Sequence, residues 1–217
     1  EMQQEEVEAG FCKRYKKVFI LIPYIMLQGI SGMFIAPLLP EIMKDYFGSD
    51  ARAAEITSYI AAAMAFIGMF TAAFYGKLLD TVGRRPFFIL APLFQSSIPY
   101  LLLVTFRHQP VIYMGANALG NLIQGSYMTS YVADNFSTKT RVKVFATTSA
   151  IGSITAFFAI FPGFFSETVC LIVACVCSFG AVAYAFFFIP ESIPADVKQP
   201  MNKETAKDMI STNPFSS

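Results

Sequence analysis

Between two long apolar segments, the sequence places a short charged stretch whose residues could form and hold a turn. Asp80 and Arg84 stand four residues apart, so a local ion pair between them is feasible. Gly83 can adopt a positive φ in the turn, Pro86 suits the first turn of a following helix, and Gly76 lets two helices approach closely. This pattern predicts two antiparallel helices joined by a tight charged connection.

A second group of polar side chains lies inside the apolar segments themselves. Asn117, Asn121 and Gln124 follow one another at helical spacing, Tyr127 continues near the same face, and Gln28 lies in the first segment. Polar groups are costly in hydrocarbon unless they pair or face a wet cavity. They are therefore candidates for contacts with a bound solute, and hydrogen bonding between helices is an equal alternative.

Hydrolytic and metal chemistry find no support in the sequence. Three of the four cysteines, Cys170, Cys175 and Cys177, fall in the last apolar segment, and none has metal-ligand spacing with a histidine. Buried thiols that act as small apolar side chains explain them more simply. The single histidine, His108, lies in an expected external turn without a nucleophile nearby. We therefore expect no enzyme activity, no cofactor and no metal site.

The elements that must position these residues are long apolar segments. Apolar residues make up 55% of the chain and charged residues only 14%, against about 25% charged in a soluble domain. Each segment is long enough to cross the roughly 30 Å hydrocarbon core of a bilayer as a helix. The six segments without Asp, Glu, Lys, Arg or His are Val18–Leu39, Ile56–Gly76, Phe87–Phe106, Val111–Ala133, Val144–Phe165 and Thr168–Ile189.

These segments predict an all-α membrane protein with six transmembrane helices. A backbone in lipid must bond internally, and continuous apolar runs without strict alternation exclude a barrel. We expect a cytosolic arm over residues 1–17, a transmembrane domain over 18–190 and a polar cytosolic linker over 191–217. The apolar segments make the lipid bilayer the surroundings of the protein, and the net charge of +1 suggests no nucleic-acid partner.

The distribution of basic residues predicts the orientation. Of the 16 lysines and arginines, 13 lie in the N-terminal arm, the 77–86 and 134–143 connections and the C-terminal tail. Lys44, Arg52 and Arg107 lie on the other side. Because cytosolic loops carry the excess of basic residues, both termini are expected to be cytosolic.

Small residues and prolines predict how the helices pack and bend. Gly32, Gly76 and Gly152 each belong to a stripe of small residues at four-residue intervals, which we expect to serve chiefly in helix packing. Pro92 and Pro99 lie in the third segment, and each removes an intrahelical hydrogen bond. A bend is therefore expected there.

The charged connection resembles the loop between helices 2 and 3 of the major facilitator superfamily, whose pattern is Gly-x-Leu-x-Asp-Arg-x-Gly-Arg-Arg. Thr81 replaces the first Arg, and the matching positions are Gly76, Leu78, Asp80, Gly83, Arg84 and Arg85. Three further features are similar to the family: Gln124 followed by glycine, Asp134 followed by Arg141, and Pro190-Glu191-Ser192 after the last segment. Tetracycline-exporter-like and folate-transporter-like branches fit best.

The resemblance implies that the chain is the N-terminal six-helix half of a solute transporter that works by alternating access. A C-terminal half, or a second copy, would complete it. It also implies that Asp80, Arg84 and Asp134 form a cytosolic charge cluster, with Arg84 bridging the two acids, and that this cluster latches onto the other half. The implied gating residues are Gly76, Asp80, Gly83, Arg84, Arg85, Asp134 and Arg141. The implied cavity contacts are Gln28, Asn121, Gln124 and Tyr127.

Two features of the fourth segment bear on the solute. Its candidate contacts are uncharged, which indicates a neutral or hydrogen-bonding solute. Asn121 stands where proton-coupled members often have an arginine, so proton coupling through this helix is not expected. Two alternatives to a half-transporter are a six-helix homodimer that transports by itself and a non-transporting membrane protein that binds or regulates full-length transporters.

Overall fold

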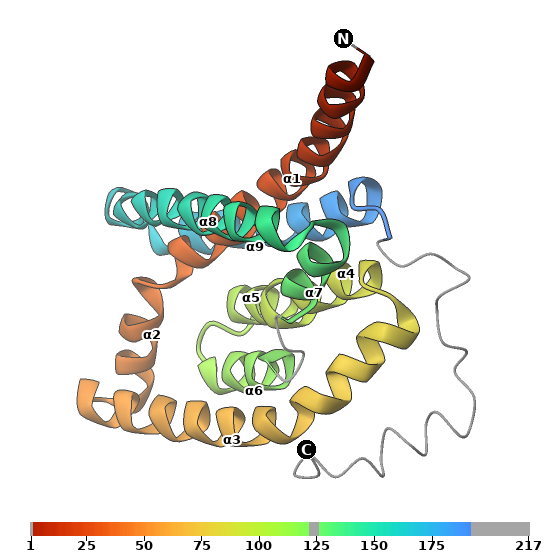
Figure 1. The fold of residues 1–217 in the computed structure, drawn as a ribbon. Helices are drawn as coiled ribbons and strands as arrows, with labels where there is room; N and C mark the ends of the chain where they lie inside the picture. Colours follow the sequence, from red (N-terminus) through yellow and green to blue (C-terminus); the bar gives the residue numbers. More distant parts are fainter. Residues whose placement is uncertain (1, 122–125, 192–217) are drawn as a thin grey trace.

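The computed structural model describes residues 2–121 and 126–191, so Gln124 and the predicted linker from residue 192 onward lie outside the described residues. Within the two described ranges every regular element is a helix (Figure 1). The helices are α1 Met2–Ile35, α2 Leu38–Phe47, α3 Asp50–Val82, α4 Arg85–Pro92, the π-helix η1 Leu93–Ser97, α5 Ile98–Thr105, α6 Pro110–Asn121, α7 Ser126–Asn135, α8 Thr138–Thr155, the 3₁₀-helix η2 Ala156–Phe164 and α9 Glu167–Phe188.

The helices are long and apolar enough for a membrane protein, as the sequence predicted. Five described stretches have the length and composition to cross a bilayer: Val18–Phe47, Asp50–Thr71, Arg85–Thr105, Thr140–Phe164 and Glu167–Phe188. The remaining predicted crossing, residues 111–133, corresponds to α6 and α7 with residues 122–125 between them. The all-helical membrane fold is confirmed, and the count of six crossings stays a prediction.

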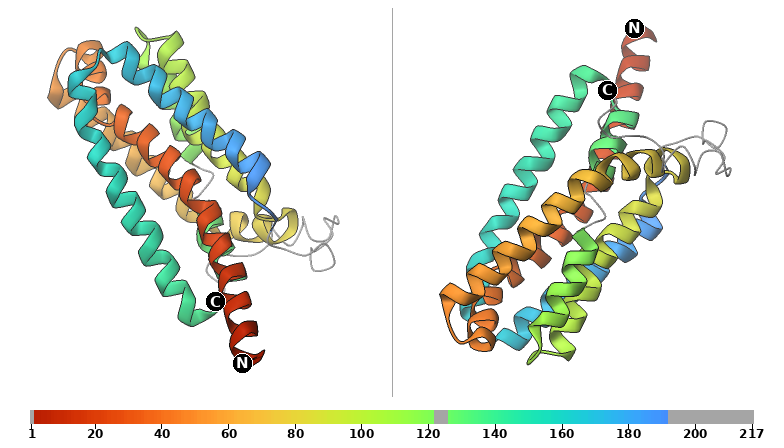
Figure 2. Two further views of the ribbon diagram at one scale, coloured as in Figure 1. Left: turned by 90° about the horizontal axis from the view of Figure 1, so that it is seen from above. Right: turned by 90° about the horizontal axis from the view of Figure 1, so that it is seen from below.

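The connections between helices gather at two ends of the bundle (Figure 2). At one end, which we call the hairpin end, the Nε of Arg84 lies 3.1 Å from the Oδ2 of Asp134, and its backbone N lies 2.9 Å from the Oε1 of Glu191. The ends of α3, α7 and α9 therefore meet there. At the opposite end Arg107 forms an ion pair with Glu167. Connections at two opposite ends are expected when consecutive helices run in alternating directions.

Two helices extend beyond the apolar segments that predicted them. α3 runs on through the predicted connection as far as Val82, so the turn itself is reduced to Gly83 and Arg84. Leu79, which is 1% exposed, continues the buried face of α3, and no residue before Gly83 breaks the helix. α8 likewise begins at Thr138, in the predicted basic connection. Charged residues at these ends can remain helical because they lie beyond the hydrocarbon.

The first predicted crossing is divided into α1 and α2 at Ala36 and Pro37. Pro37 and Pro40 both lack the backbone N–H that a continuous helix would use at those positions, so the helix is interrupted at Ala36 and Pro37, and Pro40 falls in the first turn of α2. At the other end, α1 continues through the predicted arm to Met2, and this part of the helix projects beyond the bundle (Figure 1).

The two prolines of the third crossing flank a π-helical turn. Pro92 precedes η1, and Pro99 follows it in α5. Pro99 has no N–H to donate to the carbonyl of Gln95, and the side chain of Asn117 donates to that carbonyl instead, at 3.0 Å. At the predicted bend the structure thus has a π-turn, and a side chain of the neighbouring helix α6 donates to one of its carbonyls.

The glycine stripes correct one prediction about packing. A Cβ added at Gly32, Gly76 or Gly152 would meet no atom within 4 Å, so the described residues pack against none of these glycines. Close approaches occur instead at Gly29, where a Cβ would overlap Thr155, and at Gly120, where it would overlap the backbone of η1. Within the described residues Gly76 therefore makes no close helix contact, and its open face leaves the predicted approach to a helix from outside this part of the chain.

Two apolar clusters form the core. The one nearer the hairpin end includes Leu21, Phe88 and Tyr131, each fully buried. The other includes Met43 and Leu171, each of which is 2% exposed to solvent. Both clusters include residues of α1 and α9, which pack closely against each other, and α4, α5 and α8 each contact one helix of this pair.

Candidate functional site: a charge cluster at the hairpin end

Gly83 turns the chain from α3 into α4. Its backbone N–H caps α3 by donating to the carbonyl of Leu79 at 3.2 Å. Its φ of 102° and ψ of 171° lie in a region that only glycine adopts without strain, as the sequence predicted for the sign of φ. The next residue, Arg84, lies inside the bundle and is only 7% exposed. Pro86 stands in the first turn of α4.

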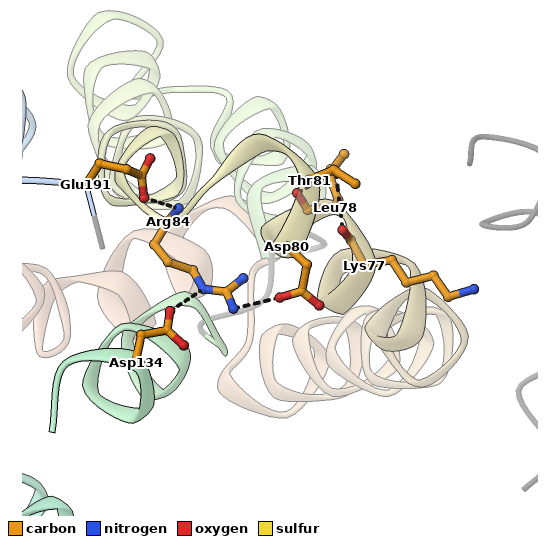
Figure 3. A network of polar contacts seen from close by, with 7 residues as sticks. All are labelled: Lys77, Leu78, Asp80, Thr81, Arg84, Asp134 and Glu191. Atoms are coloured by element: carbon orange, nitrogen blue, oxygen red, sulfur yellow. Dashed lines mark hydrogen bonds and ion pairs between the residues drawn. The ribbon is translucent and has the colours of Figure 1, made fainter. Parts of the chain in front are cut away.

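Thr81 stands where the family pattern has an arginine. Its hydroxyl donates to the carbonyls of Lys77 and Leu78, at 3.3 and 3.1 Å, and Figure 3 shows it on the side of the last turn of α3 away from Arg84. The threonine thus satisfies helix carbonyls and adds no charge to the cluster.

Arg84 joins two carboxylates from different helices (Figure 3). Its Nη2 lies 2.7 Å from Oδ1 of Asp80 on α3, and its Nε lies 3.1 Å from Oδ2 of Asp134 on α7. The arginine side chain is 8% exposed, that of Asp134 30% and that of Asp80 61%. Charge-assisted hydrogen bonds of this kind are among the stronger polar contacts in proteins. Both predicted partners of Arg84 are therefore in place.

A third acid, Glu191, also contacts Arg84. Its Oε1 accepts the backbone N–H of Arg84 at 2.9 Å, so the end of α9 is tied to the start of α4. Sequence reasoning noted Glu191 only as part of a family ending and did not assign it to the cluster. The available signal was the unsatisfied N–H groups at the start of a helix, which an acid from the same side of the membrane can accept.

The remaining predicted arginines hold nearby turns. Arg85 donates from Nη2 to the carbonyl of Phe186 at 2.6 Å, and its guanidinium lies 6.0 Å from the centre of that ring. Arg141 donates to the carbonyls of Ala133 and Phe136, at 2.6 and 2.9 Å. Arg85 therefore ties α4 to α9, and Arg141 closes the connection between α7 and α8.

An aromatic group lies directly beside the cluster. The ring of Phe88 meets Tyr24, Tyr127 and Tyr131 edge-on, at centroid distances of 5.3, 4.9 and 5.2 Å. The hydroxyls of Tyr24 and Tyr127 lie 3.1 Å apart, and Tyr127 is 9% exposed. The structure thus places Tyr127 in the core between α1, α4 and α7.

The other predicted cavity residues lie farther from the hairpin end. Oε1 of Gln28 accepts from Ser96 in η1, at 3.3 Å. Asn121 donates to Asn117 at 2.9 Å, and both asparagines line a pocket of about 190 Å³ between α2, α3 and α6. Three methionines, Met43, Met64 and Met114, line the same pocket. Asn117 was noted in the sequence, but its place in the pocket required the structure.

Comparisons with known proteins agree with this architecture. The model of the Major Facilitator Superfamily matches residues 21–216. The tetracycline resistance protein, class B, of Escherichia coli is 30% identical over 130 residues, which cover 59% of this chain and 31% of that protein. Multidrug resistance protein 2 of Bacillus subtilis (strain 168) is 26% identical over 206 residues, which cover 88% of this chain and 48% of that protein.

A solved structure has a similar fold. The crystal structure of the human organic anion transporter MFSD10 (TETRAN) superposes with a TM-score of 0.71 at 18% identity, over 91% of this chain and 53% of that chain. The chain therefore spans about half, or less, of the length of the relatives it matches.

Proposed function

The chain belongs to the Major Facilitator Superfamily, a family of membrane transporters, and from this membership we propose that it takes part in moving a small solute across the bilayer by alternating access. It is an integral, multi-pass membrane protein. In the proposed arrangement it is the N-terminal six-helix half, with both termini and the hairpin end on the cytosolic side. Residues 1–17 and 191–217 then flank the transmembrane domain.

The observation that carries this proposal is the position of Arg84 between two carboxylates. Arg84 is buried and held by Asp134, whereas the side chain of Asp80 is 61% exposed at the end of α3. An exposed carboxylate held in place from one side can meet the positive N-terminus of a helix in a second half. We assign Asp80 this latch role in one of the two access states, with Gly83, Arg85 and Arg141 supporting the turns around it.

The latch must be modest in energy, because transport requires both access states to be populated. Arg84 is suited to such a role. It keeps its contact with Asp134 whether or not Asp80 has a partner elsewhere, so opening the latch leaves no isolated buried charge.

The open glycine faces support a second six-helix unit as the partner of this chain. Gly32, Gly76 and Gly152 lie on α1, α3 and α8, and each leaves room for an approaching backbone. Small residues are the usual surfaces for helix association in lipid. A C-terminal six-helix half fits these faces, and a second copy of the chain is the alternative occupant.

The pocket beside Asn117 and Asn121 supports a class of solute. Its described lining has no acidic or basic side chain, and its methionines can adapt to differently shaped apolar groups. A neutral or amphiphilic organic molecule with hydrogen-bonding groups fits such a lining. The names of the relatives refer to tetracycline, to multidrug resistance and to organic anions. Gln28, Gln124 and Tyr127 stay predictions as further contacts.

Transport by the complete protein in proteoliposomes tests the proposal, with tetracycline and a fluorescent amphiphilic dye as probes and with or without a pH gradient. Asp80→Asn should leave membrane insertion intact and slow transport by roughly fivefold or more, the effect of a coupling energy above about 1 kcal/mol. The matched control is Asp45→Asn, an exposed acid at the opposite end. Normal transport by the Asp80 variant would remove the latch role.

The same experiment separates the alternative functions. Absence of transport together with co-purification of a different, full-length transporter would favour the regulatory protein. Transport by this chain alone, as a stable dimer, would favour the homodimer.

A further inference from the structure

A groove between α1 and α8 lies outside the residues assigned to transport. Its volume is about 320 Å³, and it opens near the hairpin end, next to the connection between α7 and α8. Its walls are mostly bulky and apolar, and one edge carries a lysine and two threonines. The lining residues are Val18, Phe19, Ile22, Phe136, Thr140, Lys143, Val144 and Thr147.

Lys143 supplies a positive charge at the edge of this groove. The side chain is exposed, and it forms no ion pair with any side chain that the structure describes, which leaves out those of residues 1–17. The arginines at the same end are engaged with protein acceptors: Arg84 with two carboxylates, and Arg85 and Arg141 with backbone carbonyls. The charge of Lys143 is therefore available to a partner from outside the chain.

We propose that this groove binds one anionic phospholipid, with an acyl chain along the apolar wall and the phosphate at Lys143. The hydroxyl of Thr140 and the N-terminal turns of α8 lie beside the same edge and favour a negative group. Basic pockets between transmembrane helices on the cytosolic side are suited to acidic headgroups. Phe19, which is 65% exposed, offers its ring to the chain of such a lipid.

The shape of the groove favours a lipid over a second protein domain. Helices dock in lipid through small residues, and the glycines that could serve this purpose, Gly32 and Gly152, do not line the groove. Its walls carry Phe19, Ile22 and Phe136 instead. These bulky side chains would hold the backbone of an approaching helix away from the groove. A flexible acyl chain can fill the irregular space that such side chains leave.

Native mass spectrometry of the purified complete protein tests the proposal, with phosphatidylglycerol and phosphatidylcholine of identical acyl chains as probes. Lys143→Ala should abolish the preference for phosphatidylglycerol, a loss of about fivefold, the factor expected for one basic residue near an acidic surface. Lys143→Arg should keep the preference. Lys77→Ala, which removes a lysine from the same end but outside the groove, is the matched control.

A second variant tests the apolar part of the site. Thr147→Phe places a ring in the groove without changing its charge, and it should weaken the binding of both lipids. The headgroup alone, glycerophosphoglycerol, and inorganic phosphate should not compete. The proposal is overturned if Lys143→Ala keeps the preference, if phosphate alone displaces the lipid, or if the complete protein shows no lipid bound because other helices fill the groove.

Discussion

Replacing Asp134 with asparagine should destabilise the fold more than the same change at Asp80, although Asp80 is the nearer partner of Arg84. The two distances are 3.1 and 2.7 Å, which would change a Coulomb energy by only about a sixth in a uniform medium. The exposed fractions are 30% and 61%, and solvent changes the effective dielectric constant several-fold between such sites. Burial should therefore decide the order.

The magnitudes follow from the same comparison. An exposed ion pair contributes about 0.2–1 kcal/mol, and we expect Asp80→Asn to cost about 0.5 kcal/mol of unfolding free energy. A hydrogen bond to a charged group in a less exposed setting contributes about 1.5–3 kcal/mol, and some screening remains at Asp134. We therefore expect about 1.5 kcal/mol for Asp134→Asn.

Reversible unfolding in mixed detergent micelles can measure both changes. A double-mutant cycle with Arg84→Ala then gives the coupling energy of each pair. The coupling of Arg84 with Asp134 should exceed that with Asp80, whereas transport should depend more on Asp80. An equal or larger unfolding cost for Asp80→Asn would refute the argument that burial, and not distance, ranks these contacts.

Three further predictions concern the backbone. Gly83→Ala should cost about 1–3 kcal/mol of unfolding free energy because its φ and ψ suit glycine alone, while Gly76→Ala, in open space within a helix, should be neutral or stabilise by up to about 1 kcal/mol. Gly120→Ala should force α6 away from η1 and lower the midpoint of thermal unfolding, and a wild-type midpoint would contradict that close approach. Asn117→Ala should cost about 0.5–1.5 kcal/mol by removing the hydrogen bond that its Nδ2 donates to the carbonyl of Gln95 in η1, and less in a Pro99→Ala background, where a backbone N–H becomes available; equal costs in the two backgrounds would refute that link.

The hairpin could be predicted from the sequence because its chemistry is local. Asp80, Gly83 and Arg84 lie within one turn, so their spacing alone indicates the ion pair and the positive φ, and both are present. The contact with Glu191 could not be predicted in this way. It joins residues far apart in the chain, and it depends on where α9 ends relative to the start of α4.

The small-residue stripes illustrate a different limit. Spacing shows which face of a helix a neighbour can approach closely, but it does not show which helix approaches. Gly32 and Gly76 have the expected spacing and meet open space, whereas Gly29 and Gly120, which were not singled out, carry the close contacts. Helix length was also underestimated, because α3 continues through charged residues as far as Val82.

The asparagines of α6 show how the structure separates two functions that the sequence left equal. Pro99 has no N–H to donate to the carbonyl of Gln95, to which the Nδ2 of Asn117 donates instead, and the Oδ1 of Asn117 is then the acceptor for Asn121. Asn117 is therefore a contact between helices. The Oδ1 of Asn121 keeps its capacity to accept a hydrogen bond at the pocket, so a solute bound there is expected to bring a donor. A proline in one helix thus sets the hydrogen-bonding character of a pocket lined by another.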